Sequence, residues 1–338
     1  MKKLASVAVS LGVILVIVGL VLVGIYGRDK IMSGDWFAFG SANLSSANDG
    51  EDIQADKLEG LQEIKVNVSA YAVYVLKSET DVLSVKYVTP LENGVEINVS
   101  PIEDGVLTVT QTDSLSRGHW GFSWWYNHRF IAIYVPQSKE PAKVKLSITA
   151  NYSSVDISDT NFVSVDVATD AGAVKIDDVN ADGIMTVDTS AGSIKVHDVN
   201  AHSVSLSSSA GSITAGEVEC VNFKASASAG SIKAMDIDAT DSAEIKVSAG
   251  SVKCDIDTAK LVINSGAGSI KFETNAAAIE LSSGAGSIAG TVDGNKGDYS
   301  ITVKQDMGSS NISNQTGSAG KSLKVESDMG SIKIKFDN

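Results

Sequence analysis

The densest group of side chains that could bind a ligand lies between residues 118 and 130, which read GHWGFSWWYNHRF. This segment holds three of the four tryptophans and two of the four histidines in the chain. Large rings can stack on sugars, insert at a membrane surface or anchor a protein partner. An alternative is an aromatic plug that closes the open end of a repetitive β-structure, and we favour the plug. The candidate binding residues are Trp120, Phe122, Trp124, Trp125, Tyr126 and His128.

Residue patterns that support catalysis or metal binding are missing from the sequence. It contains no G-x-S-x-G nucleophile elbow, H-E-x-x-H zinc motif, P-loop or paired C-x-x-C. His119 and His128 are nine residues apart, which is not a standard metal-ligand spacing. The acids at 177–178 and 255–257 lack the G-G-x-G-x-D calcium pattern and are interpreted as solvated turn residues. The sequence therefore predicts no catalytic residue, no cofactor and no metal ion.

Composition also limits the partners. The chain of 338 residues has 27 Lys and Arg against 41 Asp and Glu, a net charge of −14. Such a charge repels phosphate backbones and argues against nucleic acid. The two cysteines, Cys220 and Cys254, fall at different positions of different repeats. They are predicted to be small buried side chains and not a disulfide.

An apolar segment at residues 4–27 is long enough to cross a membrane as a helix, which needs about 20 residues. Two lysines precede it, and Arg28–Lys30, with a smaller net charge, follow it. The positive-inside rule then predicts a cytoplasmic N-terminus, with residues 28–338 outside. A cleaved signal peptide is the alternative, but its apolar region is normally shorter and ends in a small-x-small site. We expect a retained single-pass anchor in the cell membrane.

The strongest signal is a repeated tripeptide, Gly-Ser/Ala-Ile/Val. Successive glycines are 18 to 22 residues apart, and the copy at Gly308 is degenerate. A unit of about 19 residues is too short for helical repeats or a propeller blade, but it fits one rung of a β-solenoid. The repeat glycines, which we expect to be structural corners, are Gly172, Gly192, Gly211, Gly230, Gly250, Gly268, Gly286, Gly308 and Gly330.

Apolar residues keep a fixed phase relative to each glycine. Before Gly192 they are Met185 and Val187, and after it Ile194 and Val196. Alternation with a period of two predicts half-buried strands on both sides. The two inward sets differ by an odd number of residues, so a straight strand would turn one set outward. We therefore expect the chain to bend at Ser-Ala-Gly, where glycine tolerates close backbone approach.

Charged residues form two further columns in the same phase. Stacked like charges are unfavourable, so we expect the columns to run near each other and partly compensate. The simpler interpretation is a solvated face that keeps the solenoid soluble; the alternative is a lysine strip that binds anionic envelope polymers. Lys175, Lys195, Lys233, Lys253, Lys271 and Lys333 lie three residues after a glycine, and Asp178, Asp198, Glu217 and Asp236 lie six residues after one.

The sequence divides into four segments. Residues 1–27 are a short cytoplasmic tail and the anchor, and residues 28–60 are a polar extracellular spacer. Residues 61–150 are β-rich without the glycine phase and are interpreted as irregular first rungs or a cap, and residues 151–338 are the regular repeats. The strands expected in the third segment are 64–68, 71–76, 82–88, 95–99, 106–110, 130–135 and 144–148.

Several motifs carry a family resemblance. SAGSIKV at 190–196, SAGSIK at 228–233, GAGSIK at 266–271 and IAIYVP at 131–136 resemble the putative-adhesin β-strand-repeat family of bacterial envelope proteins. The resemblance covers roughly residues 60–338. It implies a repetitive all-β domain of unknown function at the bacterial envelope, and it carries over no catalytic residue.

The predicted protein is thus all-β: a single-chain β-solenoid of about ten short rungs after one transmembrane α-helix. The expected function is a non-enzymatic adhesin or surface-binding module for an envelope polymer, a glycan or a ligand on a host or neighbouring cell. One alternative is an envelope-stress accessory protein that self-associates through its solenoid ends. Another is a glycan-active β-helix enzyme, which would need long loops around a cleft, whereas these rungs are short and nearly uniform.

Overall fold

The computed structural model describes residues 44, 47, 49–53, 58, 60–88, 95–113, 129–136 and 144–337. All of them belong to one compact unit that begins at Leu44. Within them no helix is long and apolar enough to cross a membrane. The predicted anchor at 4–27 lies outside the described residues.

The described residues form one 21-stranded arrangement. The strands are β1 (Asp49–Ile53), β2 (Glu63–Val68), β3 (Ala72–Ser78), β4 (Leu83–Tyr87), β5 (Val95–Val99), β6 (Val106–Asp113), β7 (Phe130–Pro136), β8 (Lys145–Ala150), β9 (Val155–Phe162), β10 (Ser164–Thr169), β11 (Val174–Thr189), β12 (Ile194–Ala210), β13 (Ile213–Ala229), β14 (Ile232–Ala249), β15 (Val252–Ala267), β16 (Ile270–Thr274), β17 (Ala278–Ala285), β18 (Ile288–Asp293), β19 (Tyr299–Met307), β20 (Lys321–Met329) and β21 (Ile332–Asp337). A 3₁₀ helix, η4, spans Lys296–Asp298.

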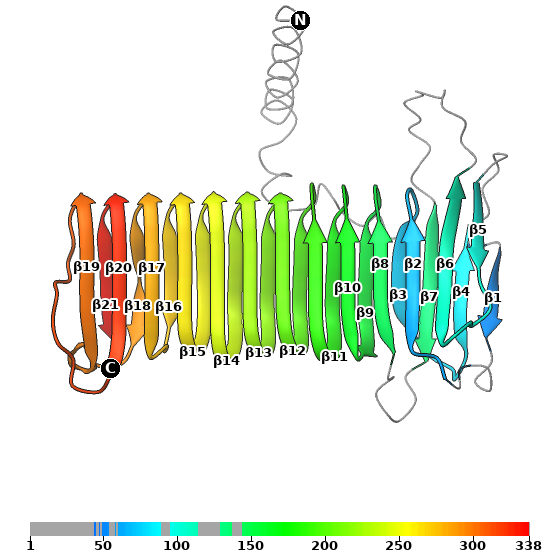
Figure 1. Ribbon diagram of the computed structural model, residues 1–338, viewed down its shortest axis with the longest axis horizontal. Helices are drawn as coiled ribbons and strands as arrows, with labels where there is room; N and C mark the ends of the chain where they lie inside the picture. The colour runs from blue at the N-terminus through cyan, green and yellow to red at the C-terminus, as the bar shows by residue number, and fades with distance from the viewer. Residues whose placement is uncertain are drawn as a thin grey trace, which may run out of the picture. The chain divides into compact units, whose positions relative to one another are not determined.

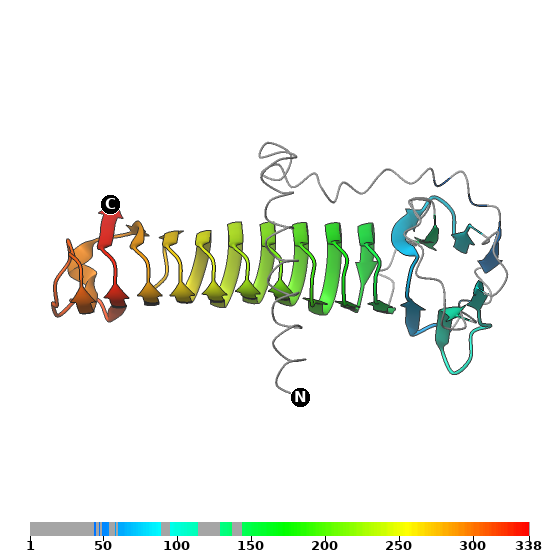
Figure 2. The same ribbon diagram turned by 90° about the horizontal axis from the view of Figure 1, so that it is seen from above.

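Successive repeats stack as parallel strands in register. Ile194 of β12 lies opposite Val174 on one side and Ile213 on the other, and this pairing continues to β16. Figures 1 and 2 show the rungs side by side in one row. The predicted all-β solenoid of about ten rungs is confirmed.

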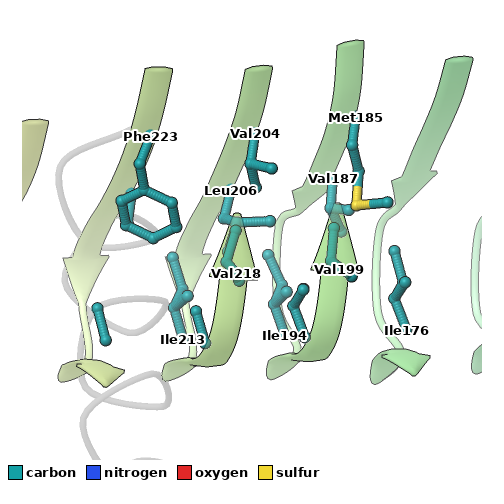
Figure 3. Close-up of a cluster of buried hydrophobic side chains, with 14 of the residues drawn as sticks. Ile176, Met185, Val187, Ile194, Val199, Val204, Leu206, Ile213, Val218 and Phe223 are labelled. Carbon is teal, nitrogen blue, oxygen red and sulfur yellow. The ribbon is translucent and has the colours of Figure 1, made fainter. Parts of the chain in front are cut away.

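The core runs through the inside of the stack. Each rung contributes Val, Ile, Leu or Ala side chains, with few larger ones such as Phe223, and they form one continuous buried cluster. Figure 3 shows Met185 and Val204 in one row, Val187 and Leu206 in a row below it, and Ile176, Ile194 and Ile213 in a row at the bottom. Burial of each such aliphatic side chain contributes about 1.5–3 kcal/mol before chain entropy is subtracted.

Each regular rung bends at three places. In β12 the alternation of buried and exposed side chains breaks at His197-Asp198, at His202-Ser203 and again at its end, before Gly211. The bend at Ser-Ala-Gly was predicted, and the other two were not.

The first of these additional bends uses an acidic residue in the left-handed region. The φ angles of Asp159, Asp178, Asp198, Glu217 and Asp236 lie between 51° and 57°. Among residues with a side chain, Asp and Asn adopt this conformation most readily. The predicted outward acid column is therefore also a backbone corner. After β14 the rung shortens, and the pairing register shifts between Ala234 and Ile237.

The corner glycines stack directly on one another. A Cβ atom on Gly211 would lie 1.9 Å from the carbonyl oxygen of Gly192, and one on Gly230 would lie 2.0 Å from that of Gly211. No side chain fits at such a distance, so the stacking of rungs itself requires glycine. The same approach recurs at every corner glycine from Gly172 to Gly330.

Rung order departs from chain order at the C-terminal end. β20 pairs with β17 on one side and with β19 on the other, so the last strands in sequence lie between earlier ones (Figure 1). Gly330 accordingly packs on Gly286, and Gly308 packs on Gly330. Gly308 therefore follows Gly286 in the chain but not in the stack.

The N-terminal end shows a similar exchange. β2 lies between β6 and β8, and β3 lies between β7 and β9. β4 then pairs antiparallel with β7, β1 with β4, and β5 with β6. All seven strands expected between residues 64 and 148 are present as β2–β8, with ends shifted by up to three residues.

Residues 308–318 close the C-terminal end of the core. The side chain of Ile312 is buried there. The amide of Asn311 accepts from the backbone N–H of Ile334 and donates to its carbonyl, both at 2.8 Å. Gln315 bridges to Ile301 of β19 through two backbone hydrogen bonds of 2.9 and 3.0 Å. Side-chain amides and one short segment thus occupy strand edges that another rung would otherwise cover.

Candidate functional site

The aromatic candidates lie outside the described residues. These six side chains fall within 114–128, so the structure gives no account of them. Both flanks are described: β6 ends at Asp113 and β7 begins at Phe130. Phe130 is buried and packs edge-on against Tyr74, with ring centroids 6.1 Å apart.

An acidic groove follows the left-handed corners. It encloses about 530 Å³. Seven carboxylates line it, because the acid of each corner and the outward residues beside it recur on successive rungs. The lining residues are Asn180, Asp198, Val199, Asn200, Glu217, Val218, Glu219, Asp236, Ile237, Asp238, Asp255 and Asp257.

Within this groove the ionised form of Asp255 is disfavoured. Burial raises the pKa of Asp255 above its usual value, and the nearby charges of Glu273, Asp236 and Asp257 raise it further. No group of three or more His, Cys, Asp or Glu side chains in the described part of the chain is arranged to hold a metal ion. The groove is therefore a negatively charged surface strip without a preformed metal site.

Replacing Asp255 with asparagine is expected to raise the stability of the protein at pH 7. A carboxyl group whose pKa is higher in the folded than in the unfolded state destabilises the fold when ionised. That penalty is relieved as the pH falls through the raised pKa, so the difference from wild type should shrink in acid. Thermal melts at pH 7 and pH 4 measure this difference.

Asp166→Asn is the matched control for that substitution. Asp166 is an exposed residue of β10 outside the groove. If both variants gain the same stability at pH 7, or if Asp255→Asn loses stability, the groove does not disfavour the charge of Asp255.

A lysine column runs beside the groove. Lys233, Lys253 and Lys271 lie opposite one another in register on β14, β15 and β16. In the same row, Thr214 lies between Lys195 and Lys233, and Ala289 lies between Lys271 and Lys333. All five are exposed. We use "lysine column" for these five residues.

None of the five forms an ion pair within the described residues, so the predicted compensation by the acid column is not seen as ion pairing. Lys175, at the start of the same row, does have carboxylate partners. Its Nζ lies 3.1 Å from Asp177 Oδ2 and 3.9 Å from Asp156 Oδ1.

His197 forms a cluster that the sequence did not reveal. Its Nδ1 lies 3.3 Å from Asp177 and its Nε2 lies 3.1 Å from Glu217, residues of the two neighbouring rungs. The imidazole bridges the two acids across the stack. Only the stacking register could have indicated it, because these residues are 20 positions apart in the chain.

Comparison with known proteins gives one family and several solved structures. The model of the family described as Toastrack DUF4097 matches residues 61–278 and 183–335. A search of curated proteins found no match.

Three solved structures resemble the fold, and each covers 86% of this chain. A "putative adhesin" from Bacteroides fragilis is 16% identical over 96% of its own chain, with a TM-score of 0.42. A "putative cell adhesion protein" from Clostridium sporogenes is 11% identical over 100% of its chain, with a TM-score of 0.26. A "putative lipid binding protein" from Parabacteroides distasonis is 15% identical over 98% of its chain, with a TM-score of 0.37.

Proposed function

The chain belongs to the Toastrack DUF4097 family, and from this premise we propose that it is a membrane-anchored surface protein that binds or adheres without catalysis. The observation that supports this most is the uniform stack. Rung after rung presents the same outward positions in register, as Lys233, Lys253 and Lys271 do. A repeated polar surface of this kind suits many weak contacts with an extended or multivalent ligand.

The proposed location follows from the sequence before the stack. Residues 4–27 would span the membrane once, with the more positive flank in the cytoplasm. Residues 28–338 would then lie outside the cytoplasm, and residues 28–60 would separate the stack from the bilayer.

The proposed contact segment is residues 118–130, with Trp124 and Trp125 as its central rings. Its flanking strands, β6 and β7, belong to the end of the stack opposite β19. The rigid stack would thus present the aromatic segment at one end. Aromatic side chains supply large contact areas at low entropic cost.

Two measurements on intact cells test this proposal. External protease should remove an epitope tag placed after Asn338, because that end would be exposed. Trp124→Ala/Trp125→Ala should lower attachment to a glycan-coated surface by about tenfold, which corresponds to about 1.4 kcal/mol. The control is Ile184→Ala, which removes an apolar side chain 54% exposed on β11. A protected tag, or equal attachment by the double variant and the control, would contradict the proposal.

A further inference from the structure

The lysine column differs from four other outward lysines of the stack, which are ion-paired. Lys224 and Lys246 both pair with Glu244, and Lys260 Nζ lies 3.1 Å from Glu280 Oε1. Lys324 likewise lies 3.1 Å from Glu326. Each of these four lysines thus has an acid beside it.

In the lysine column, the residue opposite a lysine on the neighbouring strand is often another lysine and not an acid. Strands in neighbouring rungs are about 4.8 Å apart, so Lys233, Lys253 and Lys271 form a row of like charges at that spacing. Like charges directly opposite each other on paired strands are destabilising. A ligand that carries negative charges along its length would relieve this repulsion.

Hydroxyl groups accompany the lysines. Ser231, Ser251 and Ser269 lie two residues before them and are exposed on the same side of the rungs. The column therefore combines ammonium groups with hydrogen-bonding hydroxyls at the same repeat distance. Sugars with carboxylate groups present both complementary features, a negative charge and several hydroxyls.

We propose that the lysine column binds a linear anionic polysaccharide that lies along the stack. A single exposed ion pair contributes only about 0.2–1 kcal/mol, so a lone anion would gain little. A polymer that contacts several lysines at once adds these small terms together. The choice of a polysaccharide rests on the proposed extracellular function and on the exposed hydroxyls of Ser231, Ser251 and Ser269 beside the lysines.

The acidic groove restricts where such a polymer can lie. Asp255 and Glu273 follow Lys253 and Lys271 by two residues, and Asp255 lines the groove. Repulsion from these carboxylates keeps a polyanion on the lysine and serine side. The protein's net charge of −14 adds a further penalty for densely charged polymers such as nucleic acids.

Binding of the full-length chain in detergent to immobilised polygalacturonate tests the inference. Lys233→Gln/Lys253→Gln/Lys271→Gln should weaken binding by about tenfold, and raised salt should weaken wild-type binding. The matched control is Lys224→Gln/Lys246→Gln/Lys260→Gln, which removes three positive charges from ion-paired positions. It should stay within about twofold of wild type. Neutral dextran should not bind.

Three results would overturn the inference: no binding of wild type to polygalacturonate, equal losses in both triple variants, or equally tight binding of duplex DNA. These results are independent of the protease and attachment measurements. If the protein is exposed on cells and mediates attachment but does not bind polygalacturonate, the proposed function stands and the polysaccharide site is contradicted. If the protein binds polygalacturonate but its tag is protected from external protease in intact cells, the binding site stands and the proposed location is contradicted.

Discussion

Gly230→Ala is expected to destabilise the protein by about 3 kcal/mol or more. The new Cβ would lie 2.0 Å from the carbonyl oxygen and 2.6 Å from the carbonyl carbon of Gly211. Both are backbone atoms, so two rungs must separate. That movement also strains the hydrogen bond from Gly230 N–H to Ala249 O, which is 3.1 Å long. Circular dichroism melts should show a lower midpoint, by roughly 5–10 °C.

Gly216→Ala is the matched control for that variant. Gly216 lies in β13, the strand that leads to Gly230, but a Cβ there would be 3.6 Å from His197 Cδ2 and 3.9 Å from Met235 O. These are ordinary contacts, so the change should stay within about 0.5 kcal/mol. If both alanine variants have the same melting midpoint, the corner glycines do not stack as described.

Asn311→Ala/Ile312→Ala is expected to open the C-terminal end of the stack, with a loss of about 3–5 kcal/mol. Removing Asn311 leaves the N–H and carbonyl of Ile334 without their side-chain partner. Removing the Ile312 side chain, which is only 6% exposed, uncovers the end of the core. An uncovered strand edge pairs readily with another chain, so light scattering of the detergent-solubilised protein should show concentration-dependent association.

Asn180→Ala/Ile184→Ala provides the matched control with the same change in composition. The Asn180 amide is exposed and donates across to Asn161 Oδ1, at 2.9 Å, and Ile184 is largely exposed. This variant should remain unassociated and close to wild type in stability. Association at equal concentrations in both variants, or in neither, would contradict a capping role for residues 308–318. A functioning cap also argues against self-association through this end.

The repeat could be predicted because it has local causes. A glycine fixes each Ser-Ala-Gly corner, and residues such as Met185 and Val187 alternate on a half-buried strand. Both features act within one rung, so a single sequence is enough to reveal them. Parallel stacking then follows, because one rung cannot bury its apolar side chains alone.

Rung order could not be predicted, because the repeats are nearly interchangeable. The apolar pair before Gly308 resembles the pair before Gly330, so either could follow Gly286 by pattern alone. The rung order is determined by the segment between the two glycines. Its Asn311 hydrogen-bonds the edge of β21 and its Ile312 is buried, so this segment closes an end of the stack and does not form an interior rung. The acid corner was missed for a different reason. A left-handed φ at Asp198 leaves no periodic signal apart from one extra outward residue.

The candidate site was predicted only in part. The lysine and acid columns were visible in the spacing, but their pairing depends on side-chain reach across rungs. Lys175 forms ion pairs with Asp177 and Asp156, whereas Lys253 forms none with the described residues. The bridge from His197 to Glu217 likewise depends on the stacking register.

Disulfide trapping tests the stacking order on which every outward column depends. Ser287 and Ser331 have Oγ atoms 3.2 Å apart, and neighbouring strands place Cα atoms within disulfide range. The native thiols should not compete, because both are buried and burial raises the pKa of Cys220 to about 12. Under mild oxidation Ser287→Cys/Ser331→Cys should cross-link within the chain, and Ser287→Cys/Ser309→Cys should not. Cross-linking of the second pair and not the first would mean that the rungs follow chain order, contrary to the structure described.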